Sequence, residues 1–456
     1  MTKTPTIAIF DIGKTNKKLL LFDEQYNVVF EQSIQLPETT DEDGFPCEDI
    51  ALLTQWVKDS FNAVLQMPAF TLKAVNFSGY GASFVYINKE GNIIAPLYNY
   101  LKSYPPLLLE KFYTTHGGES LFAKQTASPV LGSLNSGMQV YRLKLEQPAL
   151  FAQVAFALHL PQYLSYILTS KPATDITSIG CHTNLWNFQN KCYHEWLAKE
   201  KILPVFAPIM PATTAVPFTN NDNEYIAGIG LHDSSAALIP YLASFSEPFI
   251  LLSTGTWSIS FNPFNHEALS DVELHQDCLC YMSYMGNPIK ASRLFAGHEH
   301  EEQVKRLAAH FNKPYNYFTT VVCDKQILSR LQQKKNTVMQ SAGSAQVASS
   351  AFAKRDLQLF NTYEAAYHQL IADIMLLQVH AIKLVLASTK VKRIFVDGGF
   401  SKNPIYMHLL AKAFPRITVY AATVAQASAL GAAMVLHEHW NTKALPNNLV
   451  QLQQYP

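Results

Sequence analysis

Near its start the chain places a carboxylate directly before a turn of small and cationic residues. The stretch IAIFDIGKTNKKLLLFD begins at Ile7, and its first apolar run closes on Asp11. Gly13 lets backbone N–H groups approach an anion, and Thr15 and Asn16 add side-chain donors. A carboxylate only accepts hydrogen bonds, so beside phosphates it acts chiefly through a divalent cation. The pattern predicts a phosphate-binding hairpin with Asp11 facing Mg²⁺, and an ordinary polar hairpin is the alternative.

Three lysines, Lys14, Lys17 and Lys18, occupy the same turn, and each could neutralise phosphate charge. The turn is not a Walker A loop, because the GxxxxGK[ST] pattern is missing and a second apolar run follows instead of a helix. The stretch therefore predicts a phosphotransferase. The nucleotide contacts expected in this turn are Gly13, Lys14, Thr15, Asn16 and Lys18.

A second apolar strand runs into hydroxyl-bearing residues in LLSTGTWSIS, which contains Thr254, Gly255 and Thr256. A hairpin of threonines that favour β-structure is the simpler explanation for this stretch alone. Because it has the same layout as the opening stretch, we expect these three residues to form a second phosphate clamp.

A third strand, in IFVDGGFSKNP, ends in Gly398 and Gly399, whose backbone can lie flat against a planar ring. Ser401 is predicted to start a helix that contains Asn403 and Pro404, and a strand–helix turn capped by Ser401 is the alternative. Gly398, Gly399 and Asn403 are therefore candidate contacts for a planar ring or a sugar.

A fourth stretch, GIGLHDSSAAL, places Asp233 where a strand gives way to a helix. A carboxylate at that position often only caps the helix. The functional interpretation is a general base that removes the proton from an attacking hydroxyl group.

These stretches require elements that alternate between strand and helix. Short apolar runs over 7–12, 18–23 and 28–32 predict strands, and helical spacing of apolar residues predicts a helix over 49–65. The rhythm restarts near Ala227, and a long amphipathic helix is expected over 363–387. The chain is predicted to be α/β, with two domains of related topology, 1–244 and 245–456, around a central cleft.

The amino-acid composition excludes some classes of binding partner. The 456 residues are 48% hydrophobic and 15% charged with zero net charge, which argues against binding to nucleic acid or to anionic membranes. No apolar run predicts a membrane span or a signal peptide. Scattered cysteines favour a reducing cytoplasm, and a homodimer is left open. The cysteines are Cys47, Cys181, Cys192, Cys278, Cys280 and Cys323.

The ordered set of four stretches, with AQASALGAA after the third, resembles the FGGY family of carbohydrate kinases over nearly the whole chain. The resemblance implies two actin-like (ribonuclease H-like) domains and phosphoryl transfer from Mg-ATP to a sugar hydroxyl. It also implies that Gly398, Gly399 and Asn403 lie in the adenosine pocket. It implies that Asp233 is the catalytic base, that Asp11 is the metal-side carboxylate, and that the three turns bind the nucleotide. Three departures affect the nucleotide side: Lys14 replaces a common Thr, Phe400 a frequent glycine and Gln426 a frequent acid.

In this family the sugar is usually gripped by the turn after the first helix, which here reads FSGYGASF. Tyr80, Gly81 and Ala82 stand where xylulose kinases carry Gln-Met-His and glycerol kinases Gln-Arg-Glu. Small residues there indicate room for a bulkier or more apolar end of the sugar. His232 before Asp233 is similar to rhamnulose and fuculose kinases.

The resemblance therefore favours a 6-deoxyketohexose such as L-rhamnulose or L-fuculose. Tyr98 and Asn99 are further expected pocket-wall residues, and the alternative for Tyr98 is a place in the core. A kinase of another sugar or polyol is one alternative, and a non-catalytic nucleotide-binding protein of the same fold is the other.

Overall fold

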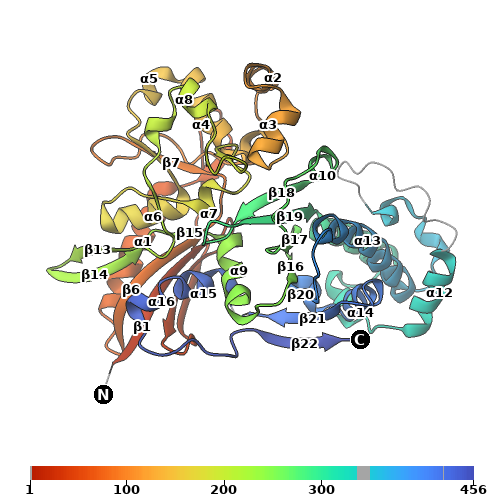
Figure 1. The fold of residues 1–456 in the computed structure, drawn as a ribbon. Helices are drawn as coiled ribbons and strands as arrows, with labels where there is room; N and C mark the ends of the chain where they lie inside the picture. Colours follow the sequence, from red (N-terminus) through yellow and green to blue (C-terminus); the bar gives the residue numbers. More distant parts are fainter. Residues whose placement is uncertain (1–2, 336–349, 425) are drawn as a thin grey trace. The chain divides into compact units, whose positions relative to one another are not determined.

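The computed structural model describes residues 3–335, 350–424 and 426–456, and these form two compact units (Figure 1). Unit 1 contains residues 3–244, 280–288 and 426–449. Unit 2 contains the described residues of 245–279, 289–424 and 450–456. The expected division at 244/245 therefore needs two corrections, because the strand tip 280–288 and the segment 426–449 pack within unit 1.

The sheet of unit 1 is built outward from its first strand, β1. Strand β1 pairs antiparallel with β2, which pairs antiparallel with β3, and on its other side β1 is parallel to β6. Strands β14 and β15 continue in parallel beyond β6, and β13 closes that edge. The bounds are β1 (Thr4–Ile12), β2 (Lys17–Asp23), β3 (Val28–Ile34), β6 (Phe70–Gly79), β13 (Ala215–Asn220), β14 (Asn223–Gly228) and β15 (Leu231–His232).

The sheet of unit 2 repeats this plan. Strand β16 pairs antiparallel with β17 on one side and parallel with β20 on the other, and β21 continues in parallel. Strand β17 also pairs antiparallel with β19. The order β19, β17, β16, β20 and β21 of unit 2 thus matches the order β3, β2, β1, β6 and β14 of unit 1, and in each row only the second strand runs in the opposite direction. The bounds are β16 (Phe249–Thr254), β17 (Ser258–Asn262), β18 (Cys278–Met282), β19 (Pro288–Leu294), β20 (Arg393–Gly398), β21 (Thr418–Thr423) and β22 (Gln451–Tyr455).

Helices cover both faces of the unit 1 sheet because its central strands are apolar on both sides. Helices α1 and α6 pack on one face, with Phe10 and Leu53 in one core cluster. Helices α9 and α15 contact the same sheet, and α15 packs closely on α9, since a Cβ on Gly431 would lie 1.9 Å from the Ala236 carbonyl oxygen. The helices of unit 1 are α1 (Ile50–Leu65), α2 (Pro106–Thr115), α3 (Glu119–Thr126), α4 (Ser136–Glu146), α5 (Pro148–Phe151), α6 (Leu160–Thr169), α7 (Ile176–Ile179), α8 (Trp196–Lys199), α9 (Asp233–Ser244), α15 (Ala427–Met434) and α16 (His437–Trp440).

Short two-stranded sheets lie in the segments that connect the main elements of unit 1. They are β4 (Glu38–Thr40) with β5 (Pro46–Glu48), β7 (Phe84–Ile87) with β8 (Phe156–His159), β9 (Thr174–Asp175) with β12 (Ile209–Met210), and β10 (Trp186–Asn187) with β11 (Cys192–Tyr193).

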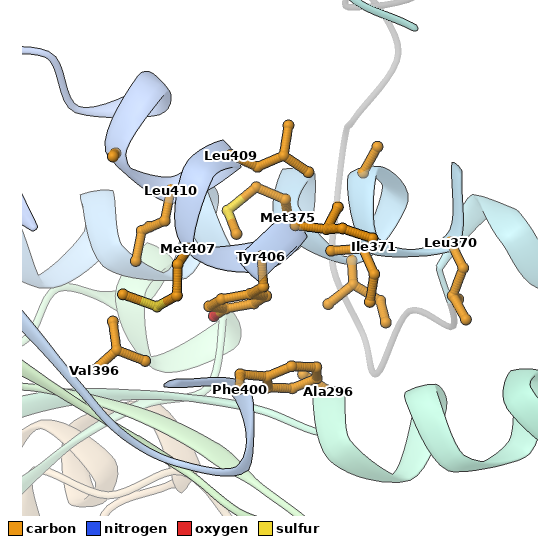
Figure 2. Packing of buried hydrophobic residues seen from close by; sticks show 14 of the residues in the cluster. Ala296, Leu370, Ile371, Met375, Val396, Phe400, Tyr406, Met407, Leu409 and Leu410 are labelled. Carbon is orange, nitrogen blue, oxygen red and sulfur yellow. The ribbon is translucent and has the colours of Figure 1, made fainter. Parts of the chain in front are cut away.

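The core of unit 2 forms around the predicted long helix, which runs over Tyr363–Leu386 as α13. Figure 2 shows Leu370, Ile371 and Met375 of this helix packed with Tyr406 and Phe400. Helix α13 is long and apolar enough to cross a membrane, but it is mostly buried in this core, as expected of a core helix. The other helices of unit 2 are α10 (Asp271–His275), α11 (Ala296–His310), α12 (Lys325–Lys335) and α14 (Pro404–Ala413).

Candidate functional site

In unit 1 the three stretches that the sequence singles out meet at one end of the sheet. Parallel pairing sets Asp11 of β1 opposite Ser78 of β6, and Ser78 opposite Leu231 of β15. The strands therefore end together, and the residues that follow lie at one edge: the Gly13 turn, Tyr80 and Asp233. Ligands of open α/β sheets commonly bind at the carboxyl ends of parallel strands.

The strand pleat directs Asp11 away from the α1 face. Phe10 and Ile12 pack in the core beneath α1, so Asp11, between them, points to the opposite face. There its Oδ2 accepts a hydrogen bond from Ser428 Oγ of α15 at 2.9 Å. Burial raises the pKa of Asp11 to about 6, and the nearby charge of Asp233 adds to the increase.

Asp233 begins helix α9, directly after β15, and about a third of its side chain is exposed. Its Oδ1 accepts a hydrogen bond from its neighbour's backbone, Ser234 N–H, at 2.6 Å, and lies 3.4 Å from Nδ1 of His232. Burial raises the pKa of Asp233 to about 6. Two accessible acids with raised pKa values at one strand edge are typical of a catalytic or cation-binding centre.

The lysines of the first hairpin differ in what they can contact. Lys17 is buried, and its Nζ pairs with Glu48 at 2.8 Å, so our suggestion that it neutralises phosphate is wrong. Lys14 and Lys18 are partly exposed and pair with Glu38 and Glu31 at 2.6 and 3.2 Å.

The rest of the hairpin tip is held by its own contacts. Gly13 N–H donates to the Asn16 carbonyl at 3.0 Å, and Asn16 Oδ1 accepts from Gln35. Thr15 is exposed. Gln426 accepts a hydrogen bond from Lys18 Nζ at 2.9 Å, so this departure from the family pattern holds the lysine in place.

The expected sugar-side residues divide into two groups. Tyr80 is buried beside Glu48, and the space beside Gly81 is filled by a ring, because a Cβ there would lie 2.4 Å from His232 Nε2. Ala82 is also buried, and its carbonyl accepts a hydrogen bond from Gln139. The prediction that Gly81 and Ala82 leave room for a bulky sugar end is therefore wrong.

Tyr98 and Asn99 line a different, very small cavity of about 30 Å³. Tyr98 Oη donates to Glu42, and Asn99 Nδ2 donates to the Pro46 carbonyl. Nothing in these contacts brings either residue to Asp233. Burial raises the pKa of Tyr100, and the charge of Asp233 adds to the increase. The centroid of the Tyr100 ring lies 6.0 Å from that of Tyr80.

Sequence reasoning also missed buried residues around the base. Cys181, His182 and Tyr281 lie with His232, with ring centroids 5.8–6.3 Å apart for the three ring pairs. Burial lowers the pKa of His232 to about 4, so this imidazole is neutral at pH 7. These residues lie far apart in the chain, and only the unusual pair of a cysteine followed by a histidine could have drawn attention to them.

In unit 2 the second and third stretches also meet, because Thr254 at the end of β16 lies opposite Gly398 at the end of β20. Thr254 is buried, and its Oγ1 donates to the Asp397 carbonyl at 2.5 Å and accepts from Phe400 N–H at 3.0 Å. Its hydroxyl therefore fastens the two loops. Gly255 and Thr256 are exposed at the hairpin tip.

The third loop is held by its first glycine and by a helix cap. Gly398 has φ +89°, and a Cβ on it would lie 2.0 Å from the Thr254 carbonyl oxygen, so the position requires glycine. Asn403 caps α14 through its Oδ1, whereas Ser401 lies in a 3₁₀ turn, which corrects the predicted helix start. Asn403 Nδ2 donates to Tyr367 Oη at 2.8 Å, and Gly399 is exposed beside it.

Comparison with known protein families also divides the chain into two domains. The N-terminal domain of the FGGY family of carbohydrate kinases matches residues 6–233, and the C-terminal domain of carbohydrate kinase FGGY matches residues 246–444. The chain belongs to the FGGY family.

The curated FGGY relatives include rhamnulokinases. That of Yersinia pestis (strain Pestoides F) is 24% identical over 246 residues, which cover 49% of this chain and 47% of the relative. That of Mannheimia succiniciproducens is 24% identical over 259 residues, covering 56% and 52%. The chain thus spans about half the length of the curated relatives it matches.

Solved structures extend the likeness over the whole fold. A carbohydrate kinase from Novosphingobium aromaticivorans superposes with a TM-score of 0.80 at 22% identity, covering 99% of this chain and 94% of that one. Xylulose kinase from Lactobacillus acidophilus gives a TM-score of 0.77 at 17% identity, covering 95% and 89%. At such identities the likeness establishes the fold, which confirms the predicted pair of α/β domains.

The Asp11 end of this FGGY fold has donors that fit Mg²⁺, a hard cation that prefers carboxylate oxygens and retained waters. Asp11 is half-buried, and one of its oxygens accepts a hydrogen bond from Ser428. Its pKa is raised because burial and the negative charge of Asp233 outweigh the nearby positive charge of Lys18. A divalent cation would supply more positive charge.

Proposed function

We propose that this FGGY protein is an ATP-dependent carbohydrate kinase in which Asp233 is the general base. One observation carries the proposal: Asp233 and Asp11 lie at the same strand edge of unit 1, and burial raises the pKa of each to about 6. A base with a pKa just below working pH is deprotonated and still basic enough to accept a proton.

In the proposed reaction a sugar hydroxyl loses its proton to Asp233 as its oxygen attacks the γ-phosphorus. The new O–P bond forms while the bond from that phosphorus to the bridging oxygen breaks, which releases ADP. When bound, Mg²⁺ would neutralise charge on the phosphates, and Asp11 is the residue that would hold it. Ser234 N–H orients the base through its 2.6 Å hydrogen bond.

For the nucleotide we propose Gly13, Lys14, Thr15, Asn16 and Lys18 in unit 1, and Thr254, Gly255, Thr256, Gly398, Gly399 and Asn403 in unit 2. In unit 2 the side chains of Thr254 and Asn403 and the N–H groups of Gly255 and Gly398 already donate hydrogen bonds within the protein. We therefore propose that the nucleotide lies against the exposed surfaces of Gly255, Thr256 and Gly399.

For the acceptor we propose a ketose, in particular a 6-deoxyketohexose such as L-rhamnulose. The rhamnulokinase relatives and the His232–Asp233 pair support this choice. For the pocket wall we propose His232, Tyr80 and Tyr100, because the charge of Asp233 influences Tyr100 and the Tyr100 ring lies beside that of Tyr80. The place of Tyr98 and Asn99 in this wall stays a prediction. We further propose that the protein works in a reducing compartment, since no disulfide links the cysteines in the described part of the chain.

The test is ADP release from Mg-ATP with a panel of ketoses, 6-deoxyketoses, polyols and gluconate. Wild type should turn over one ketose, and Asp233→Asn should lower kcat by about 10²–10⁴-fold with ATP affinity nearly unchanged. Ser234→Ala is the matched control, because it removes only the 3.3 Å hydroxyl contact to Asp233 and keeps the backbone one. Wild-type turnover in Asp233→Asn would refute the base. ATP binding without turnover of any acceptor would point to the non-catalytic alternative.

A further inference from the structure

Unit 1 contains a compact group of sulfur and nitrogen ligands beside the proposed base. Cys181, His182 and His232 each offer one ligand atom, and these atoms lie within 4.8 Å of one another. The three residues are 1%, 7% and 3% exposed. The first two follow α7 and the third ends β15, so the fold and not sequence proximity assembles the group.

The ligand atoms of the three residues lie close together, and a hydrogen bond orients the ring of His182. His182 Nδ1 lies 3.1 Å from the Leu134 carbonyl, which can only accept, so Nδ1 carries the proton and Nε2 keeps its lone pair. A Cβ placed on Gly81 would lie 2.4 Å from His232 Nε2 and 3.6 Å from Cys181 Sγ, so both ligand atoms face the space beside Gly81.

The ring proton of His232 changes place when a metal binds. Nδ1 of His232 accepts a hydrogen bond from Ser234 N–H at 3.2 Å and lies 3.4 Å from Asp233 Oδ1, so the neutral ring carries its proton on Nε2. Metal binding at Nε2 would shift that proton to Nδ1, where it would face the Asp233 carboxylate, while Ser234 N–H keeps its shorter 2.6 Å bond to the same carboxylate. Such a carboxylate orients the ring and makes Nε2 a better ligand. Within the described residues this is the one group of three or more His, Cys, Asp or Glu side chains with converging ligand atoms.

We propose that Cys181, His182 and His232 bind a borderline-soft divalent metal, Zn²⁺ being the best match. One thiolate and two imidazoles form a set that selects zinc over Mg²⁺, and three protein ligands leave a fourth tetrahedral position for water. The thiol proton is released when the metal–sulfur bond forms.

The site touches the proposed active centre through His232 and Asp233. On the proposed function, bound zinc would therefore occupy the sugar side of the base, and zinc and sugar would compete. Metal binding itself does not depend on that function, so it is tested directly on the full-length protein.

The experiment titrates metal-free protein with Zn²⁺ against a chromogenic chelator, and with Co²⁺ by absorption. We expect one Zn²⁺ per chain and a sulfur-to-cobalt charge-transfer band. Cys181→Ser should abolish the band, and both Cys181→Ser and His182→Gln should weaken zinc binding by about 100-fold or more, beyond the effect of losing an outer-shell partner. Cys192→Ser, which removes an exposed cysteine elsewhere in unit 1, should behave as wild type.

A thermal melt of each variant separates loss of a ligand from loss of the fold, and His182→Gln keeps the test open if Cys181→Ser unfolds. Zinc binding by Cys181→Ser equal to wild type, or a cobalt spectrum without the thiolate band, would overturn the site. If the enzyme turns over a sugar and that sugar does not weaken zinc binding, the expected competition between zinc and sugar is wrong. Zinc binding in a protein without kinase activity would support the site and count only against the proposed function.

Discussion

The buried Lys17–Glu48 pair beneath the first hairpin gives the sharpest test of the fold. The two side chains are 2% and 3% exposed, and Lys17 Nζ lies 2.8 and 2.9 Å from the two carboxylate oxygens. The same ammonium donates to the Lys14 carbonyl at 3.0 Å, so it ties the turn to strand β5. We predict that Lys17→Met destabilises unit 1 because it leaves Glu48 charged and buried.

The expected loss of unfolding free energy in Lys17→Met comes more from the burial of Glu48 than from the lost attraction between the two charges. With an effective dielectric constant of about 20, charges 2.8 Å apart attract by about 6 kcal/mol, and the desolvation of both ions cancels much of this. Removing one partner alone leaves the desolvation of the other uncompensated and costs about 3–5 kcal/mol. For a unit of this size that cost lowers Tm by roughly 10 °C.

The assay is thermal and urea unfolding of the full-length protein. Lys14→Met is the matched control, because Lys14 pairs with Glu38 on the same turn with side chains 27% and 47% exposed, and its loss should cost under about 1 kcal/mol. The double variant Lys17→Met/Glu48→Gln should recover most of the stability, because it removes both charges. Equal Tm values for Lys17→Met and Lys14→Met, or no recovery in the double variant, would refute the reasoning.

The remaining predictions concern the acids and the third loop. Because Asp233 must be deprotonated to act and its pKa is about 6, kcat/KM should fall about tenfold per pH unit below pH 6; a profile that is flat to pH 5 would exclude it as the base. This folded-state pKa lies above the ordinary 3.8. Ionisation of the carboxyl therefore lowers the stability of the folded protein as pH rises from about 4 to 6. Asp233→Asn should therefore melt above wild type at pH 7.5 and equal it near pH 4, and a lower Tm at pH 7.5 would contradict this. Gly398→Ala should cost about 1–3 kcal/mol in unfolding free energy because its φ is +89°, whereas Gly399→Ala, with its nearest atom 3.9 Å away, should melt like wild type. Equal Tm values for these two glycine variants would show that the loop is not constrained.

Much of the plan was predictable from local signals. Apolar runs that stop at Asp11, Thr254 and Gly398 indicated strands, and helical spacing indicated the long helix α13. Asp49 was expected inside the first helix but caps it, which is an ordinary uncertainty of one residue at a helix end. The repeated strand–turn–strand layout predicted two related units, because each such run needs a sheet to join.

Sequence alone could not predict the partners of the side chains. The lysines of the hairpin look alike in the sequence, yet the pleat of β2 buries Lys17 against Glu48 and leaves its neighbour Lys18 partly exposed. Gly81 suggested open space, but the His232 ring, more than 150 positions away, fills it. Such contacts depend on long-range packing, which no local pattern encodes.

By itself the sequence determined where strands end and which chemical groups follow them, because apolar periodicity and glycine turns act over a few residues. Only the tertiary structure decided which of those groups meet. Parallel pairing of β1, β6 and β15 brings Asp11 and Asp233 to one edge, and the burial created there raises the pKa of both. The same packing gathers Cys181, His182 and His232, since desolvation and convergence arise only when distant segments are held together.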